Sequence, residues 1–223
     1  MTDDLTKTLL DLGARRRWDD LRAAVNDLVH TQDPRAAEAI AAVVREVNEY
    51  EGLPLLSVLG WIPGPATNAV LRSLLAADVS RNMRRAAMTS LAIVAGIEAE
   101  DDVREELVTA RSASTRTRAL LALCITGGGS AWDDVLAALP KVMRSPPFSP
   151  SMVKTAVAYM VVHRGDDAER AKRLSTAIAR YRPKMDEEDG PWVDSVWPAD
   201  DVVGAQEWMD HAVTFVVGRP PTA

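Results

Sequence analysis

The chain has 223 residues and a formal net charge of −6, with 47% hydrophobic residues but only 5% aromatic residues. The hydrophobic residues are mainly Ala, Leu and Val, a mixture that favours closely packed helices over strands rich in β-branched and aromatic residues. The single cysteine, Cys124, excludes an internal disulfide framework and suits a reducing compartment, so we expect a cytoplasmic protein.

Charge is distributed unevenly along the chain. Residues 1–184 carry 25 Lys or Arg and 23 Asp or Glu, a net of +2, whereas residues 185–223 carry nine acids and one base, a net of −8. A domain that binds nucleic acid is normally basic over its contact surface. Nucleic acid is therefore not the expected partner, and the acidic segment favours a basic one.

The N-terminal region, residues 1–32, predicts one helix or a helix pair that caps the fold. Its first residues are acidic and lack the basic and apolar regions of a secretory signal. The longest strongly apolar run, residues 91–97, is too short to cross a bilayer, so we expect no membrane partner. Spacing of four residues predicts the helical ion pairs Arg15–Asp19 and Arg16–Asp20.

Four units of two short antiparallel helices are predicted next, over residues 33–165. Residues 166–223 then contain a trailing helix over 166–181 and a last helix over 198–217, which Gly204 weakens. The whole chain, 1–223, is thus predicted to be one all-α domain. The four units cover residues 33–64, 65–96, 97–128 and 129–165.

A period of 32 residues supports this division, because similar residues recur at that spacing in both helices of a unit. A glycine is repeated where the second helix is expected to stop, at positions 64, 96 and 128. The second helices pair Ser80 with Ser112, Arg84 with Arg116, Ala87 with Ala119, and Leu91 with Leu123. The first helices align Leu71, Val103 and Val135, and also Val43, Leu75, Leu107 and Leu139.

Stacked two-helix units of this length resemble HEAT repeats. Units of that family typically carry an aspartate in the turn and a basic residue six positions later, as Asp78 and Arg84 do here. The resemblance implies a right-handed α-solenoid of about four helix pairs with capping helices at both ends. It also implies a structural ladder of Asp78, Arg84 and Arg116, and binding along a curved surface, but no particular activity.

Arginines are concentrated around two adjacent turns of the predicted repeats. Arg81, Arg85 and Arg118 are the candidates for partner contact, since guanidinium groups bind phosphate or carboxylate groups in a bidentate manner. They could equally be solvated charges that pair with the acids between residues 98 and 102. Both interpretations remain open.

The acidic segment also contains large aromatic residues. Trp192 and Trp197 fall in a predicted loop, and we expect at least one of them to be partly exposed as an anchor for a basic protein partner. The alternative is that the tryptophans cover the last apolar face of the solenoid. We expect Trp208, on the last helix, to act in this capping role.

Catalytic signatures are not recognisable in the sequence. His30, His163 and His211 have no metal-ligand spacing, and Cys124 lies on an apolar stripe, as a buried thiol would. The sequence therefore predicts no cofactor, no metal and no catalytic residue, and it carries no signal of oligomeric state. The predicted function is a non-catalytic protein-binding solenoid, such as an adaptor, an assembly factor or an inhibitor of the immunity-protein type. The alternative is a nucleic-acid-binding protein similar to HEAT-like DNA glycosylases, with Trp61 and Trp132 beside an extruded base.

Overall fold

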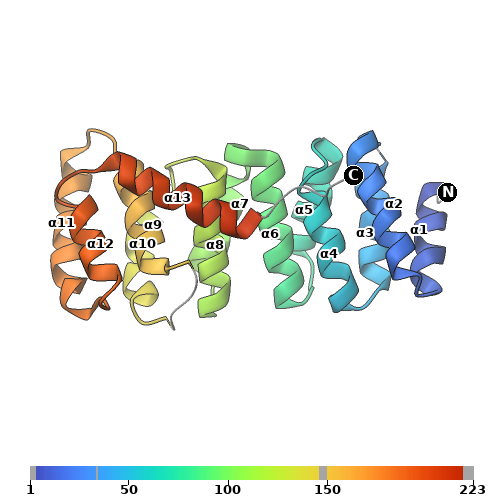
Figure 1. Ribbon diagram of the computed structural model, residues 1–223, viewed down its shortest axis with the longest axis horizontal. Coiled ribbons are helices and arrows are strands. Elements are labelled where there is room, and N and C mark those ends of the chain that lie inside the picture. Colours follow the sequence, from blue (N-terminus) through green and yellow to red (C-terminus); the bar gives the residue numbers. More distant parts are fainter. Residues whose placement is uncertain (1–3, 34, 146–149, 218–223) are drawn as a thin grey trace. The chain divides into compact units, whose positions relative to one another are not determined.

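The computed structural model describes residues 4–33, 35–145 and 150–217, and every regular element in these ranges is a helix (Figure 1). The all-α prediction is confirmed. The described helices form two compact units, unit 1 up to Ala99 and unit 2 from Glu100 to residue 217. The predicted boundary at residue 96 lies close to this division.

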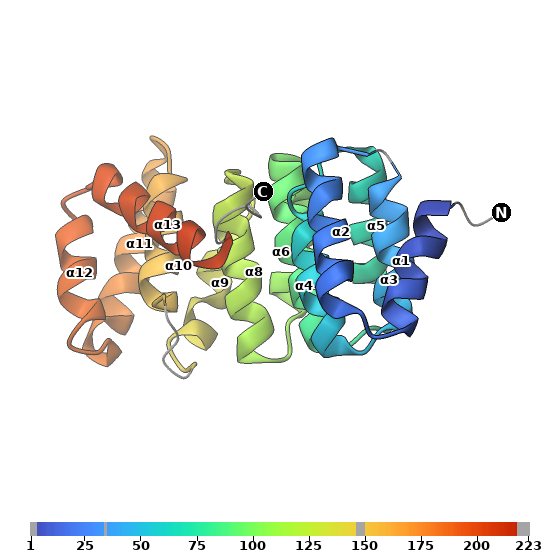
Figure 2. The same ribbon diagram turned by 45° about the vertical axis from the view of Figure 1, so that its right-hand side comes forward.

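Unit 1 consists of three successive helix pairs, with the first and second helices of the pairs in separate rows. Helices α1, α3 and α5 are neighbours in one row, and α2, α4 and α6 are neighbours in the other, as Figure 2 shows. The leading segment is thus a helix pair. The elements are α1 (Asp4–Ala14), α2 (Trp18–Thr31), α3 (Ala36–Glu46), α4 (Glu49–Leu59), α5 (Pro65–Ala76), α6 (Arg81–Ala95) and η1 (Gly96–Ala99).

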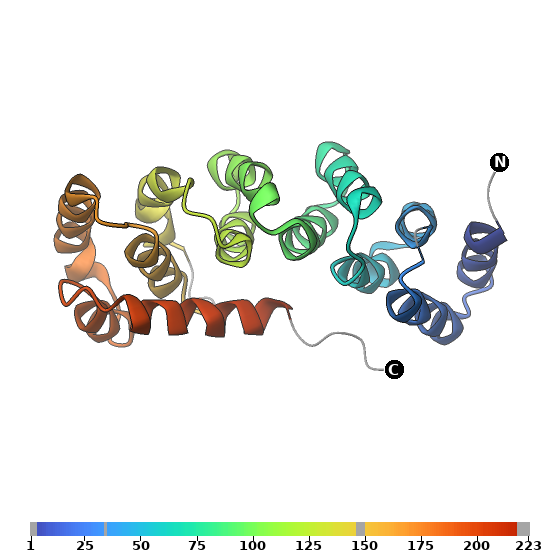
Figure 3. The same ribbon diagram turned by 90° about the horizontal axis from the view of Figure 1, so that it is seen from above.

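Unit 2 has the same two rows and one additional helix. Helix α9 lies between α7 and α11 in one row, and α10 lies between α8 and α12 in the other. Helix α13 crosses the second row and packs on α10, α8 and α12 (Figure 3). The elements are α7 (Glu100–Thr109), α8 (Ala113–Thr126), α9 (Trp132–Val142), α10 (Met152–Val162), α11 (Ala168–Tyr181), η2 (Arg182–Lys184), α12 (Asp189–Val196) and α13 (Val202–Val217).

The C-terminal segment is more helical than the sequence predicts. The region expected to be a loop contains α12, and the last helix begins at Val202 rather than at 198. Gly204 lies in the first turn of α13, where its N–H donates to Oδ1 of Asp201 at 3.0 Å, so it weakens the helix start less than a mid-helix glycine would. Part of the proline-rich insertion at 144–151 lies outside the described residues.

The repeat register has a physical basis in the helix N-caps. Asn48, Ser80 and Ser112 are 32 residues apart, and each side chain accepts a hydrogen bond from the backbone N–H three residues later, at 3.1 to 3.2 Å. Ser151 does the same for α10 at 3.3 Å. A polar side chain at this position satisfies one of the otherwise unpaired N–H groups of the first turn. The four caps therefore fix where α4, α6, α8 and α10 begin.

The apolar positions of the register form the core. Leu91 and Leu123 each have a relative exposure of 0%, as the repeat predicts for equivalent sites. The remaining aligned apolar residues are buried as well, namely Ala87, Ala119, Leu71, Val103, Val135, Val43, Leu75, Leu107 and Leu139.

The repeated glycine is only partly explained by helix termination. Gly96 ends α6 with a φ of +52°, as predicted, but Gly127 rather than Gly128 ends α8, with a φ of +73°. Gly64, with a φ of +140°, precedes α5 instead of ending α4. A position with positive φ favours glycine. In α8 this position is residue 127, one residue earlier than the repeat register predicts.

Candidate functional site

Three arginines near the starts of helices make the same contact with the end of the preceding helix. Arg84 donates to the backbone oxygen of Ala77 at 3.4 Å, Arg116 to that of Ala110 at 3.0 Å, and Arg170 to that of His163 at 3.0 Å. Carbonyl groups at a helix C-terminus have no intrahelical donor and carry partial negative charge. The contact explains why an arginine is favourable in the first turn, where its own helix dipole opposes it.

The ladder of Asp78, Arg84 and Arg116 stays a prediction, but both of its arginines donate to a backbone oxygen. Arg116 uses the carbonyl of Ala110, the residue that stands where the aspartate would be, so this link needs no carboxylate. Asp78 itself is exposed.

The candidate contact arginines belong to two different units. Arg81 is exposed and Arg85 is half-buried on α6 of unit 1, and Arg85 donates to Oδ1 of Asn82 at 3.4 Å. Arg118 is half-buried on α8 of unit 2. A joint role in partner binding stays a prediction.

The expectation that at least one of Trp192 and Trp197 is partly exposed is met by Trp192, whose role in partner binding stays a prediction, whereas Trp197 is buried. Trp197 has a relative exposure of 8%, because its indole N–H donates to Oγ of Ser175 at 3.1 Å and the Arg164 guanidinium lies 5.5 Å from its ring. A role for Trp197 as a free anchor is therefore wrong. Trp192 is half-buried, with its ring centroid 5.5 Å from that of Trp208.

Trp208 packs α13 against α10 of unit 2. Its indole N–H donates to Oγ1 of Thr155 at 3.2 Å, and Nζ of Lys154 lies 5.0 Å from the ring. Both partners are on α10. The last helix is thus held across the second row by an aromatic contact, as expected of a cap.

Several acids of the C-terminal segment are engaged within unit 2. Asp194 accepts two hydrogen bonds from Arg182 at 2.8 and 2.7 Å, which lower the pKa of this carboxyl, and Asp200 pairs with Arg164 at 2.5 Å. Asp189 is buried, which raises its pKa, and it accepts a 2.6 Å bond from Ser151. The negative charge available to a partner is therefore smaller than the sequence count suggests. Exposed acids of this segment include Asp186, Glu187, Glu188, Glu207 and Asp210.

A buried polar cluster links α7, α10 and the turn after α8. Glu100, with a relative exposure of 6%, accepts a hydrogen bond from the N–H of Ser130 at 2.9 Å. The Tyr159 hydroxyl lies 2.9 Å from the Gly128 oxygen and 3.2 Å from Oε1 of Glu100. Burial, with a further contribution from Glu100, raises the pKa of Tyr159. These contacts join three chain segments and indicate a structural role.

His163 lies beside this cluster, with its ring centroid 4.5 Å from that of Tyr159. Its Nε2 is buried without a hydrogen-bond partner, and burial lowers its pKa. A neutral imidazole is thus favoured here. Burial raises the pKa of Cys124 to about 12, which leaves this thiol unreactive.

The part of the chain that the structure describes contains neither a candidate metal cluster nor a helix that could span a membrane. No group of three or more His, Cys, Asp or Glu in these residues could hold a metal ion. Of the helices in the same ranges, none has both the length and the hydropathy needed to cross a bilayer.

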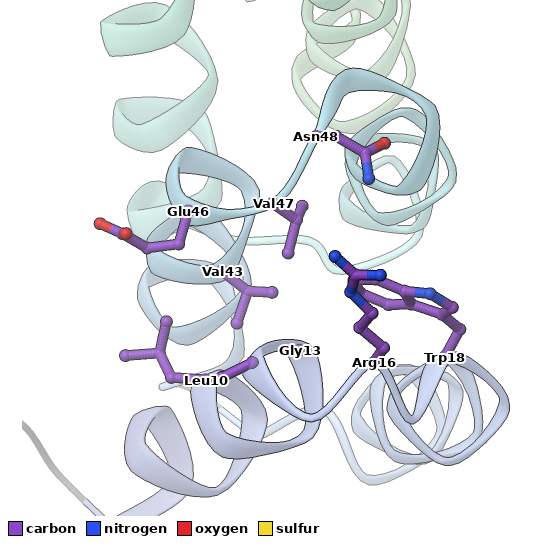
Figure 4. Close-up of a pocket in the computed structure, with 9 residues that line it drawn as sticks. Leu10, Gly13, Arg16, Trp18, Val43, Glu46, Val47 and Asn48 are labelled. Carbon is purple, nitrogen blue, oxygen red and sulfur yellow. The ribbon is translucent and has the colours of Figure 1, made fainter.

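Unit 1 contains a pocket of about 540 Å³ beside the α1–α2 and α3–α4 turns (Figure 4). Leu10, Val43, Val47 and Trp18 provide its apolar lining, and polar groups come from Arg16, Glu46 and Asn48. The charges at its edge are of mixed sign.

Arg16 stands where a helix usually has glycine. Its φ is +56°, and the N–H groups of Arg16 and Arg17 bond to the carbonyls of Gly13 and Leu12 at 3.0 and 2.9 Å. This is the Schellman arrangement that ends a helix. The break between α1 and α2 makes the predicted pairs Arg15–Asp19 and Arg16–Asp20 wrong, since four-residue spacing brings side chains together only within one helix. Arg15 pairs instead with Asp11, and Arg17 with Asp20.

Unit 2 has a groove of about 460 Å³ between α9 and α11. Leu136 and Pro140 of α9 face Ala177 and Tyr181 of α11. Its polar lining residues all come from α11, and they are Glu169, Lys172, Arg173, Thr176 and Arg180.

The basic character of the groove between α9 and α11 was not predicted from the sequence. Residues 168–184 contain six Lys or Arg and one acid, but a balance taken over residues 1–184 averages this excess away. A charge count over single helices would have revealed it.

Comparison with known protein families, with curated proteins and with solved structures finds no match to this chain.

Proposed function

We propose that the chain is a HEAT-like α-solenoid that binds another protein and has no catalytic role, as an adaptor, an assembly factor or an inhibitor would. The repeat of N-caps at Asn48, Ser80 and Ser112 supports the solenoid, as do the two rows of helices in each unit. The buried single cysteine favours a cytoplasmic location.

The observation that carries the binding function is the groove between α9 and α11. Its lining combines apolar side chains with a rim of charged ones, and this is the composition typical of protein interfaces. Tyrosine and arginine, the residue types that most often dominate binding energy, are both present as Tyr181 and Arg180.

The DNA-glycosylase-like alternative loses one of its supports. Trp132 has a relative exposure of 0% and donates its indole N–H to the Met160 oxygen at 2.8 Å. The guanidinium groups of Arg170 and Arg173 lie 5.2 and 5.3 Å from its ring. This ring has no free face on which an extruded base could stack.

The test of the proposed function is reconstitution of a complex from purified components. Affinity purification from the native host with mass spectrometry identifies candidates, and each is then expressed, purified and titrated against the full chain by calorimetry. A saturable complex with a protein supports the proposal. Binding of DNA with base excision, and of no protein, would overturn it.

A further inference from the structure

We propose that the groove between α9 and α11 binds an acidic peptide segment of the partner, with apolar side chains of that segment inserted between the two helices. This inference rests on the proposed function and names the chemistry of the partner. It depends on the floor of the groove, on its rim and on what surrounds it.

The floor of the groove is apolar and of suitable size. Leu136, Pro140, Ala177 and Tyr181 are all half-buried, so each leaves part of its apolar surface open to solvent. A volume of about 460 Å³ falls within the range of about 300 to 1,000 Å³ that binding pockets span. Apolar side chains of a peptide would remove this surface from water.

The rim of the groove is cationic. Lys172, Arg173 and Arg180 are all exposed, and Glu169 is the one acid among the lining residues. With Asp133, which pairs with Arg173, the rim carries a formal charge of +1, and the cations left for an acidic segment are Lys172 and Arg180, whose charge favours its binding and accelerates its association.

Two of the cations are held in place by their neighbours. Arg173 donates to Asp133 at 2.6 Å and lies over the Trp132 ring, and the Arg180 guanidinium lies 5.5 Å from the ring of Tyr181. Restricting these side chains before binding lowers the entropy that a partner must overcome.

The spacing of the cations specifies the peptide. Arg173, Ala177 and Arg180 follow the i, i+4, i+7 pattern of one helix face, so the backbone positions of the two arginines are about 10.5 Å apart along α11. Acids separated by two turns of a helical peptide, or by three residues of an extended one, match this distance. An apolar residue between them would lie opposite Ala177.

The surroundings of the groove favour a peptide over a nucleic acid. A nucleic acid needs a continuous track of cations along its phosphates. Here Glu169 lies on the same helix, and the exposed acids Asp186, Glu187 and Glu188 follow directly after η2. The apolar floor also has no counterpart on a phosphate backbone.

The experiment measures binding of a fluorescein-labelled peptide to the full chain by anisotropy. The peptide has about 12 residues, in a pattern that gives Leu on one face and Glu two turns apart when it is helical. The comparison probes are the same peptide with Gln in place of Glu, and a single-stranded oligonucleotide. The variants are Lys172→Glu with Arg180→Glu, which reverses the rim, and Ala177→Phe, which fills the floor. Arg45→Glu, an exposed charge reversal on α3 of unit 1, is the matched control.

We expect the acidic peptide to bind saturably, and more weakly as salt rises from about 50 to 200 mM. The rim reversal and the filled floor should each weaken binding at least about tenfold. The Gln peptide should lose a similar factor, and Arg45→Glu should change nothing. Unfolding curves of every variant separate lost binding from lost fold.

Three results would overturn the inference. One is acidic-peptide binding that the rim reversal leaves unchanged, and another is tighter oligonucleotide binding that the rim reversal abolishes. A third is a self-associated chain that the rim reversal converts to monomer, which would make a second copy the occupant.

If a reconstituted partner binds the rim and floor variants as tightly as the parent chain, the proposed function stands and this inference fails. If no protein partner exists but the peptide binds as expected, the groove chemistry stands and the proposed function fails.

Discussion

Unit 1 and unit 2 use the same helix pair, but the turn that follows a pair is built differently in the two. Gly96 in unit 1 has a positive φ and open space where a side chain would lie. Gly128 in unit 2 has no such φ, and a Cβ there would collide with the Glu100 carboxylate. The same residue thus recurs at the repeat spacing for two physical reasons.

Polar residues at equivalent positions of the repeat also differ between the two units. Glu100 is 32 residues after Asn68, and its carboxylate is bound by Ser130 and close to the Tyr159 hydroxyl. Oδ1 of Asn68 is buried without a hydrogen-bond partner. The repeat register places helices in both units in the same way. A buried polar group also needs hydrogen-bond partners, which Glu100 has and Oδ1 of Asn68 does not.

The largest expected effect concerns the buried leucine that both units have at the same position of the repeat. Leu91→Ala and Leu123→Ala should each lower the free energy of unfolding by about 2–5 kcal/mol, because each leaves a cavity at a fully buried site. Urea denaturation of the full chain measures both. Val108→Ala, at a side chain that is 56% exposed, is the control and should cost less than about 0.5 kcal/mol. A loss well below 1 kcal/mol at either leucine would mean that the two sites are not equivalent.

The next prediction compares how much Glu100 of unit 2 and Asn68 of unit 1 contribute to the free energy of unfolding. Glu100→Leu should cost about 1–3 kcal/mol, because it removes the charged acceptor of the Ser130 N–H. Asn68→Leu removes an oxygen that has no partner, and it should be neutral or stabilising in the same denaturation assay. Equal losses in the two variants would contradict this account of the polar core.

The arginine contacts are expected to be smaller and similar in both units. Arg84→Met and Arg116→Met keep much of the side-chain volume but remove the donor to the preceding helix end. Each should cost about 0.5–1.5 kcal/mol, as other hydrogen bonds do. Arg81→Met, at an exposed residue of α6, is the matched control and should have almost no effect. If the control lost as much stability as Arg84→Met, the carbonyl contact would not explain these arginines.

The sequence predicts those features of the fold that depend on residues close together in the chain. The spacing of Ser80 and Ser112 indicates two helix starts, but Asn48 escapes the same pattern because a different side chain does the same capping. The contact between Tyr159 and Glu100 spans 59 residues, and no local pattern predicts it.

Trp197 is buried by contacts with Ser175 and Arg164, which come from other segments of the chain. Its acidic neighbours in the sequence therefore suggested an exposure that it does not have. The α9–α11 groove also requires two helices that are separated along the chain.

The smallest expected effect is a gain in stability, and it concerns the end of α1. Arg16→Gly replaces a residue held at a φ of +56° by the one that adopts this conformation without strain, so we expect about 0.5–1 kcal/mol of stabilisation. Gln32, at the end of α2, has a φ of +51°, but its side chain also donates to the Val29 oxygen. Gln32→Gly should therefore gain less than Arg16→Gly, because it loses that bond. Thermal unfolding of both variants beside the parent chain measures the difference. A loss of stability in Arg16→Gly would show that its side chain holds the pocket of unit 1 together.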